Sequence, residues 1–317
     1  GGSSSSATTT ATIFVDFSVV TVTVTGGYNR EVPIDTVLKL DASSSVDTSY
    51  SATSQTDRLS YLWTCVEHDV ATFGTSCSSL IIGASSSFAT VSAGSLTEGS
   101  EYVFTIKCTS TDGTARTSSK TVLVTGSAGN TPTVSILTTV SKFNPSDSLT
   151  VVGFIEANLT SNPTASVNAF WNATGFSNLN DVALVSAFRQ FSGVSTLASG
   201  VSFQLAFAAN IFTAGDTYTF KLTSYITDSL TSAAFLDLEV NSPPVSGSFN
   251  VTPTSGIATG SNSSTQFFFT SPDWLDEDLP LTYEMLYYTN VNDPSATFTI
   301  QAKGLSTIAF ANLPSGI

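Results

Sequence analysis

Apolar and hydroxyl-bearing residues alternate along much of this chain of 317 residues. Residues 18–25, for example, read Ser-Val-Val-Thr-Val-Thr-Val-Thr. Strand-like patterns recur in five further segments, at residues 36–40, 59–63, 101–108, 121–125 and 217–222. Because successive side chains of a strand point to opposite faces, this pattern predicts half-buried β-strands. Turn-forming clusters of Gly, Asn, Asp, Ser and Pro separate the segments, and no segment carries a helix signal. The sequence therefore predicts an all-β fold.

One motif occurs twice at a constant offset of 116 residues. Leu96-Thr-Glu-Gly-Ser-Glu-Tyr-Val-Phe104 matches Phe212-Thr-Ala-Gly-Asp-Thr-Tyr-Thr-Phe220, and Val124 and Val240 stand at the same offset further on. Glycine makes a turn, and Tyr and Phe two residues apart point to the same side of a strand. We therefore expect each motif to open the F–G hairpin of a seven-stranded sandwich.

The repeat sets the domain count. Its two units end in similar linkers, Asn130-Thr-Pro132 and Asn241-Ser-Pro243, where proline blocks the strand and stiffens the joint. We predict tandem immunoglobulin/fibronectin-like β-sandwiches. Their bounds are a Ser/Thr-rich linker at 1–12, sandwiches at 13–130 and 131–241, and a third at 242–317 that is incomplete at its C-terminus. Since the chain has no initiator methionine or signal peptide, we expect it to be an internal or processed segment.

Five aromatic residues are expected to anchor the cores. Trp63 would take the place of the buried tryptophan of immunoglobulin-like sandwiches. The motif residues Tyr102, Phe104, Tyr218 and Phe220 would point inward from their strands. The prediction is that all five are buried.

The chain has three cysteines, which are too few and wrongly spaced for a zinc site: Cys65, Cys77 and Cys108. In an oxidising compartment, one pair is expected to form a disulfide. We favour Cys65–Cys77, which would close a short loop and leave Cys108 as a buried thiol. A Cys65–Cys108 bond between adjacent strands and three buried thiols are the alternatives.

Four segments resemble a known family of extracellular modules. Leu40-Asp-Ala-Ser-Ser-Ser-Val-Asp47, followed by Leu59-Ser-Tyr-Leu-Trp-Thr-Cys65, resembles the polycystic-kidney-disease (PKD) sandwich repeat. The likeness is to the variant found in the receptor-for-egg-jelly (REJ) region of polycystin-like proteins. Pro243-Pro-Val-Ser-Gly-Ser-Phe249 and Asp273-Trp-Leu-Asp-Glu-Asp-Leu-Pro-Leu-Thr-Tyr283 are similar to recognisable segments of the REJ family.

The resemblance covers most of residues 19–317 and is weakest at 141–200. It departs from the usual PKD repeat after Trp63, where Thr-Cys-Val-Glu-His-Asp replaces an Asp-Phe-Gly-Asp-Gly turn. The Trp-x-Cys form is closer to the egg-jelly variant. The resemblance implies an extracellular, adhesive or force-bearing module without catalysis.

Charge is scarce and mainly negative. There are 10 Lys and Arg residues against 24 Asp and Glu, giving a net charge of −14, and charged residues make up 11% of the chain. A surface of this sign repels phosphate backbones, and it has no basic cluster for an anionic membrane, so neither nucleic acid nor membrane is an expected partner. Since no apolar run is long enough to span a bilayer, we expect no membrane insertion in this segment.

Glycans are the expected modification. Four Asn-x-Ser/Thr acceptors occur, at Asn158, Asn172, Asn250 and Asn262, and each is expected on a loop or an exposed strand face. The hydroxyl-rich start of the chain has a composition that permits O-linked glycans.

The densest acidic cluster contains Asp273, Asp276 and Asp278. Oxygen ligands at this spacing are candidates for Ca²⁺, as at the joints between cadherin-like domains. The alternative is a solvated loop whose carboxylates accept backbone amides. No other cofactor is expected.

The sequence contains few residues that could carry out catalysis. The single histidine, His68, stands in a loop, and the chain has no nucleophile elbow, zinc-protease motif or phosphate-binding glycine loop. We predict a non-enzymatic structural or adhesive module of a cell-surface filament, stalk or flagellar appendage. Its partners would be other copies or other extracellular glycoproteins. The alternatives are a ligand- or force-sensing ectodomain of a polycystin-like receptor, and a carbohydrate-binding module using Trp171 and Trp274.

Overall fold

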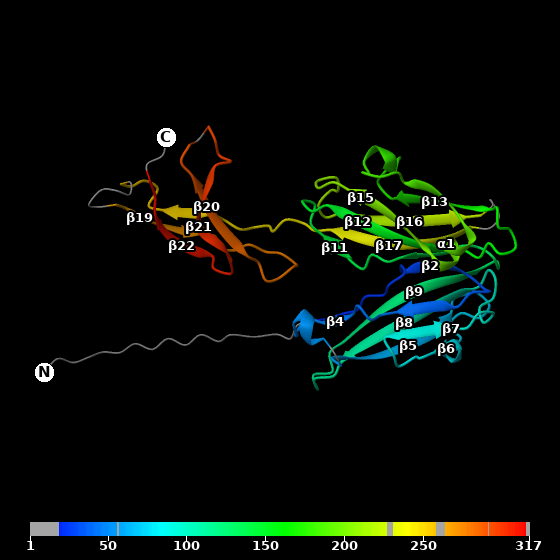
Figure 1. The fold of residues 1–317 in the computed structure, drawn as a ribbon. Coiled ribbons are helices and arrows are strands. Elements are labelled where there is room, and N and C mark those ends of the chain that lie inside the picture. Colours follow the sequence, from blue (N-terminus) through cyan, green and yellow to red (C-terminus); the bar gives the residue numbers. More distant parts are fainter. Residues whose placement is uncertain (1–18, 56, 227–230, 258–263, 291, 315–317) are drawn as a thin grey trace. The chain divides into compact units, whose positions relative to one another are not determined.

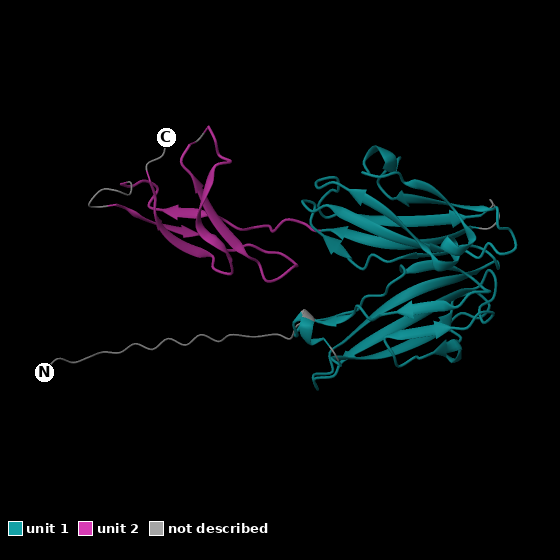
Figure 2. Cartoon of the chain, viewed as in Figure 1, with its two compact units in different colours: residues 1–240 teal, residues 241–317 magenta. Residues whose placement is uncertain are grey.

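The computed structural model describes residues 19–55, 57–226, 231–257, 264–290 and 292–314 (Figure 1). Its described residues are nearly all β, as predicted, and fall into two compact units, Gly1–Val240 and Asn241–Ile317 (Figure 2). The first unit contains two separate hydrophobic cores. The predicted linker at 1–12 and the acceptor Asn262 lie outside the described residues.

The first core lies between two groups of strands. One face is the ladder β2-β9-β8-β5, and the sheet β3-β7-β6 forms the other; the short pair β1-β4 is a separate two-stranded sheet. The strands are β1 Val20–Thr21, β2 Asn29–Pro33, β3 Leu38–Asp41, β4 Val46–Asp47, β5 Leu59–Glu67, β6 Ile81–Ile82, β7 Phe88–Val91, β8 Glu101–Ser110 and β9 Thr117–Ser127. The short 3-10 helices are η1 Ala52–Ser54 and η2 Ser78–Leu80.

The second core is built in the same way. The ladder β14-β13-β16-β17 faces the sheet β10-β12-β15, and β11 pairs with β17. The strands are β10 Thr133–Ile136, β11 Lys142–Phe143, β12 Leu149–Glu156, β13 Ser166–Ala173, β14 Phe188–Ser192, β15 Val201–Phe207, β16 Thr217–Tyr225 and β17 Thr231–Val240. A 3-10 helix, η3 Leu179–Asp181, and a six-residue helix, α1 Val194–Ser199, interrupt them. The helix was not predicted, because six residues are too few to show a helical period.

The two sandwiches share one continuous sheet. Strand β2 pairs in parallel with β9 of its own sandwich, from Asn29 opposite Leu123 to Pro33 opposite Ser127. Its other edge pairs antiparallel with β17, where Arg30 lies opposite Ala234. The main-chain pairing of β2 therefore joins the two sandwiches in addition to the linker between them.

The repeated motif opens equivalent strands, but the second strands of the two hairpins differ by two positions. Tyr102 in β8 lies opposite Val124, whereas Tyr218 in β16 lies opposite Leu238. The structural counterpart of Val124 is thus Leu238, and the sequence match of Val124 with Val240 was wrong. The register differs because the turn that joins β16 to β17 is two residues shorter than the turn that joins β8 to β9.

The second unit has fewer strands. A sheet of order β18-β19-β22 and a separate hairpin β20-β21 make up its described part. The strands are β18 Asn250–Thr252, β19 Gln266–Thr270, β20 Tyr283–Tyr288, β21 Thr297–Gly304 and β22 Ile308–Asn312. Among the described residues of this unit, only two hydrophobic side chains, Phe269 and Met285, are fully buried.

Candidate functional site

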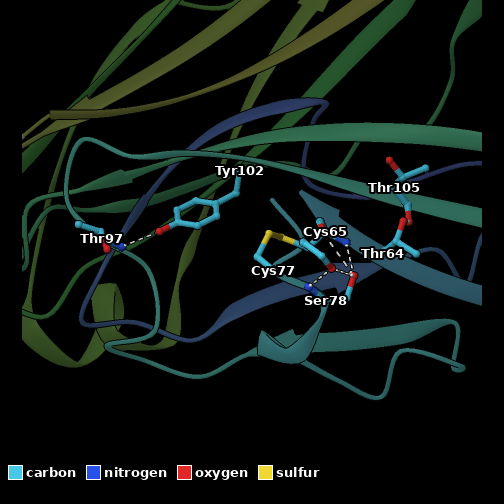
Figure 3. Close-up of a disulfide and its surroundings, with 8 residues drawn as sticks. Thr64, Cys65, Cys77, Ser78, Thr97, Tyr102 and Thr105 are labelled. Atoms are coloured by element: carbon cyan, nitrogen blue, oxygen red, sulfur yellow. Dashed lines mark hydrogen bonds between the residues drawn. A yellow bond between two sulfur atoms is a disulfide. The ribbon is translucent and has the colours of Figure 1, made fainter. Parts of the chain in front are cut away.

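A disulfide joins Cys65 on β5 to Cys77, which precedes η2 (Figure 3). Their Cα atoms are 4.9 Å apart, and both side chains are buried. The Cys77 amide donates to the Cys65 carbonyl at 3.0 Å, and the Ser78 hydroxyl accepts from the Cys65 amide at 3.0 Å. The bond therefore closes the base of the short loop that follows β5, as the favoured pairing predicted.

Strand register explains why Cys108 is left free. Cys65 lies opposite Phe104 on β8, and Cys108 lies opposite Tyr61, four residues away along the ladder. The alternative Cys65–Cys108 bond is therefore excluded. Cys108 is fully buried, and this burial raises the pKa of its thiol, so it is held protonated in the core.

A buried ion pair ties the end of β4 to the turn after β8. The Arg116 guanidinium donates to both carboxylate oxygens of Asp47, at 2.7 and 2.8 Å, and Asp47 is 0% exposed. The same guanidinium donates to Asp112 at 2.6 Å. Ser110 also donates to Asp47, at 3.0 Å. This cluster was not predicted, and it ties three segments of the first sandwich together.

Hydrogen bonding holds both carboxylates of this cluster in the charged form. Burial alone would raise the pKa of Asp47, but donation by Arg116, Ser49 and Ser110 outweighs it and the pKa is lowered. Hydrogen bonds from Thr114, then from Ser110 and Arg116, hold the pKa of Asp112 far below its usual range. Both groups therefore stay ionised at neutral pH.

Each copy of the repeated motif forms a tyrosine corner. The Tyr102 hydroxyl accepts the Thr97 amide at 3.1 Å (Figure 3), and the Tyr218 hydroxyl accepts the Thr213 amide at 3.2 Å. Such a bond fixes the turn before the F strand of immunoglobulin-like sandwiches. The motif is thus a structural device, repeated once per sandwich.

Tyr102→Phe and Tyr218→Phe are each expected to lower the free energy of unfolding by about 1–2 kcal/mol, since each leaves a turn amide without its acceptor. Urea denaturation of the single variants measures this. Tyr61→Phe is the matched control, because within the described residues the Tyr61 hydroxyl makes no hydrogen bond. Equal losses in all three variants would contradict the role of the corners.

The joint between the sandwiches is close-packed at main-chain level. The Tyr28 amide donates to the Phe235 carbonyl at 3.1 Å, and the Gly26 amide to the Ile136 carbonyl at 2.9 Å. The Tyr28 hydroxyl reaches Asp237 at 3.1 Å. Gly27, with a φ of 93°, has no room for a side chain, because a Cβ there would lie 2.6 Å from the Phe235 carbonyl oxygen.

Arg30 is a buried cation at this joint. It is 5% exposed, and its Nη1 donates to the Lys39 carbonyl at 3.2 Å. Within the described residues, its Nε and Nη2 have no hydrogen-bond partner. Burial lowers its pKa to about 10, and Asp41 opposes this shift. Arg30 borders a cavity of about 560 Å³ that is lined by both sandwiches.

The remaining predicted residues are placed as follows. Trp63, Tyr102, Phe104, Tyr218 and Phe220 are all buried. The described glycan acceptors, Asn158, Asn172 and Asn250, are exposed. Trp171 is buried in the second core, so it cannot form a sugar-binding platform, and Trp274 is half-buried.

The calcium site proposed for the acidic loop stays a prediction. In the part of the chain that the structure describes, no three His, Cys, Asp or Glu side chains form a group that could hold a metal ion, and this includes Asp273, Asp276 and Asp278. The Asp276 carboxylate instead accepts the Asp278 amide at 2.8 Å. This bond matches the alternative of a loop whose carboxylates accept backbone amides. His68 is exposed in its loop and lies 3.0 Å from Glu101.

The sequence matches the REJ domain over residues 1–317, the whole chain. The chain belongs to the REJ domain family. Membership of this family and the sandwich architecture support an extracellular β-sandwich module, and the resemblance noted in the sequence is confirmed. Within the described residues, none of the helices is long and apolar enough to cross a membrane. No curated protein sequence matches this REJ domain chain.

Solved structures resemble the REJ domain chain only distantly. A bacterial ice-binding adhesin matches with a TM-score of 0.31 and 10% identity, over 94% of this chain and 88% of that one. Drosophila N-cadherin EC1-4 matches with a TM-score of 0.27 and 9% identity, over 91% of this chain and 73% of that one. The Ig1-2 module of the Drosophila receptor protein tyrosine phosphatase DLAR matches with a TM-score of 0.24 and 11% identity, over 68% of this chain and 96% of that one. At these scores the likeness carries no argument about function.

Proposed function

We propose that this REJ domain is a non-catalytic structural and adhesive module that packs into a cell-surface filament, stalk or flagellar appendage. Its partners are other copies of the chain or other extracellular glycoproteins. The observation that carries the proposal is the sharing of β2 between two sandwiches. A module that bears or transmits force benefits from a joint made of main-chain hydrogen bonds, because such a joint resists bending at a point where a linker would flex.

Surface chemistry supports the same role. The chain carries few charges for its size, so lateral packing desolvates few ions. The acceptors Asn158, Asn172 and Asn250 are exposed, so N-linked glycans can supply the solubility that charge does not. Membership of the REJ family supports an extracellular location for such a surface.

Electron cryomicroscopy of the native, glycosylated material tests the proposal. We expect domains arranged in a regular array, with contacts along their sides and glycan density at the three exposed acceptors. An isolated flexible string of domains that leads to a membrane density would favour the polycystin-like receptor ectodomain and reject the filament.

Gly27→Ala is expected to separate the sandwiches, since its Cβ would meet the Phe235 carbonyl oxygen and force β2 away from β17. Hydrogen exchange at the Tyr28 amide should accelerate at least about tenfold, and X-ray scattering should show a more flexible particle. Gly94→Ala is the matched control, because Gly94 has a similar positive φ of 78° but open space around it. If Gly27→Ala and Gly94→Ala change the exchange rate and the scattering alike, the effect comes from backbone strain at a positive φ and not from separation of β2 from β17.

A further inference from the structure

Arg30 on β2 is a cation that is buried without an ion-pair partner. It is 5% exposed, and among the described residues no carboxylate forms a salt bridge with it. Asp41 attracts it, but burial has the larger effect and lowers the pKa of Arg30 to about 10. The group is therefore charged at neutral pH, and its charge lacks the close counter-charge that buried ions ordinarily have.

The two guanidinium nitrogens without a partner are neighbours. Nη1 donates to the Lys39 carbonyl at 3.2 Å, whereas Nε and Nη2 make no hydrogen bond within the described residues. The Nε and Nη2 hydrogens lie side by side along one edge of the planar group. This is a fork that matches the two oxygens of a carboxylate. One side of Arg30 is thus fixed by the fold, and the other side has the geometry of an anion receptor.

Arg30 is also part of the wall of a cavity between the two sandwiches. The cavity has a volume of about 560 Å³, which is within the range of small-molecule sites. Its wall contains residues from 30–39 of the first sandwich, Asn130 and Thr131 of the linker, and residues from 133–135 and 156–158 of the second sandwich. A ligand in this cavity would contact both sandwiches.

The charges around the cavity favour a singly charged anion. Arg30 and Lys39 are the cations of the wall, and Asp35 and Glu156 are its anions, so the formal charges cancel. Asp35 already accepts the Asn130 amide at 3.0 Å. A dianion such as sulfate would meet one buried cation and two carboxylates, whereas a monocarboxylate needs only the fork of Arg30.

Hydroxyl groups supply the rest of the polar wall. Thr36 donates to the Pro33 carbonyl at 2.9 Å, and Thr131 donates to the Ala128 carbonyl at 3.0 Å. Because the protons of these two hydroxyls are used by the fold, their oxygens are left to accept hydrogen bonds from a ligand. A ligand that carries hydroxyl donors beside its carboxylate would match this wall.

We infer that the cavity binds a small hydroxylated monocarboxylate, whose carboxylate pairs with Nε and Nη2 of Arg30. Both nitrogens are buried, so binding requires the guanidinium to turn toward the cavity about its terminal side-chain bonds. The ligand would then supply the counter-charge that the fold does not. This site does not depend on whether the module packs into a filament.

Isothermal titration calorimetry of the full glycosylated chain with D-glucuronate tests the inference. We expect saturable binding with a dissociation constant of about 1 mM or lower, as for an efficient ligand of this size. D-Glucose, which has the same ring and hydroxyls but no carboxylate, should bind at least about tenfold more weakly, since it leaves the fork unpaired. Inorganic sulfate should also bind more weakly than D-glucuronate.

Two kinds of variant locate the site. Arg30→Lys keeps the charge but removes the fork, so the affinity for D-glucuronate should fall at least about tenfold. Ala198→Trp tests the cavity without disturbing the buried cation, because Ala198 is an exposed residue of α1 that borders the cavity. Its indole should block binding. Ser199→Trp, on the exposed neighbour that does not border the cavity, is the matched control and should bind as the wild type does.

Several results would overturn the inference. They are the absence of binding, equal affinity for D-glucose and D-glucuronate, tighter binding of sulfate, and binding that Ala198→Trp leaves unchanged. Asn158, a predicted glycan acceptor, also borders the cavity. Binding that appears only in Asn158→Gln would therefore assign the cavity to the chain's own glycan and reject a free ligand.

Discussion

Asp47→Asn is expected to lower the free energy of unfolding of the first sandwich by about 3–5 kcal/mol, the range for breaking a buried ion pair by removing one partner. Asp47 is fully buried, and the two Arg116 nitrogens that contact it lose an ionic acceptor in the variant. Urea unfolding followed through tryptophan fluorescence measures the loss. Asp112→Asn is the matched control on the same arginine, and its partly exposed carboxylate should matter much less.

The same pair gives the fold a dependence on pH with a defined sign. The folded pKa of Asp47 is lowered, so its stabilising contribution is present above the ordinary aspartate pKa of about 4 and is lost as the pH falls below it. The stability gap between the wild type and Asp47→Asn should therefore be constant from neutral pH to about pH 5 and should narrow below pH 4. A gap that stays constant down to pH 2 would show that the ion pair does not stabilise the fold.

Removing the disulfide is the second large effect. The double variant Cys65→Ala with Cys77→Ala should lose about 3 kcal/mol of unfolding free energy, since the bond closes a short loop in the unfolded chain. The two residues are separated by 12 positions in the sequence. Chemical denaturation under oxidising conditions gives the difference between the wild type and the variant.

Reduction provides the control for the disulfide. A reductant should destabilise the wild type by a similar amount and should leave the double variant unchanged. Cys108→Ala keeps the disulfide and should remain sensitive to the reductant, because Cys108 is a free thiol. A double variant that is as stable as the wild type would show that the loop is held by its hydrogen bonds alone.

Most of the features that could be predicted came from local patterns in the sequence. Alternation identified the long strands β5, β8, β9 and β16, because a half-buried strand leaves a direct mark on its own sequence. The repeated Gly-x-x-Tyr-x-Phe motif marked both F strands for the same reason. The disulfide was accessible because its cysteines are near each other, so the short loop could be judged from spacing alone.

Contacts between residues far apart in the sequence could not be predicted from the sequence. Arg116 and Asp47 are 69 residues apart, and nothing in either neighbourhood indicates the other. Strand β2 escaped prediction because Asn-Arg-Glu-Val-Pro has no clear apolar alternation, with a buried arginine where an apolar residue is expected. The register of β17 depends on the length of a turn that sequence matching at a fixed offset ignores. Spacing alone does not show which way the carboxylates of the acidic loop point, so the calcium site there stays a prediction.

The sharing of β2 has a consequence for how the protein is made. Strand β2 leaves the ribosome well before Ala234 and Phe235, the residues with which one of its edges pairs. Until then this edge is open and able to pair with other nascent chains, the situation in which β-proteins aggregate. The polar residues Asn29 and Glu31 on β2 reduce that hazard, because charged and polar side chains on an open edge disfavour pairing with the wrong strand. The speed of translation between residues 130 and 240 therefore sets how long this edge of β2 stays unpaired. Slowing translation in that range should increase misassembly more than slowing translation elsewhere.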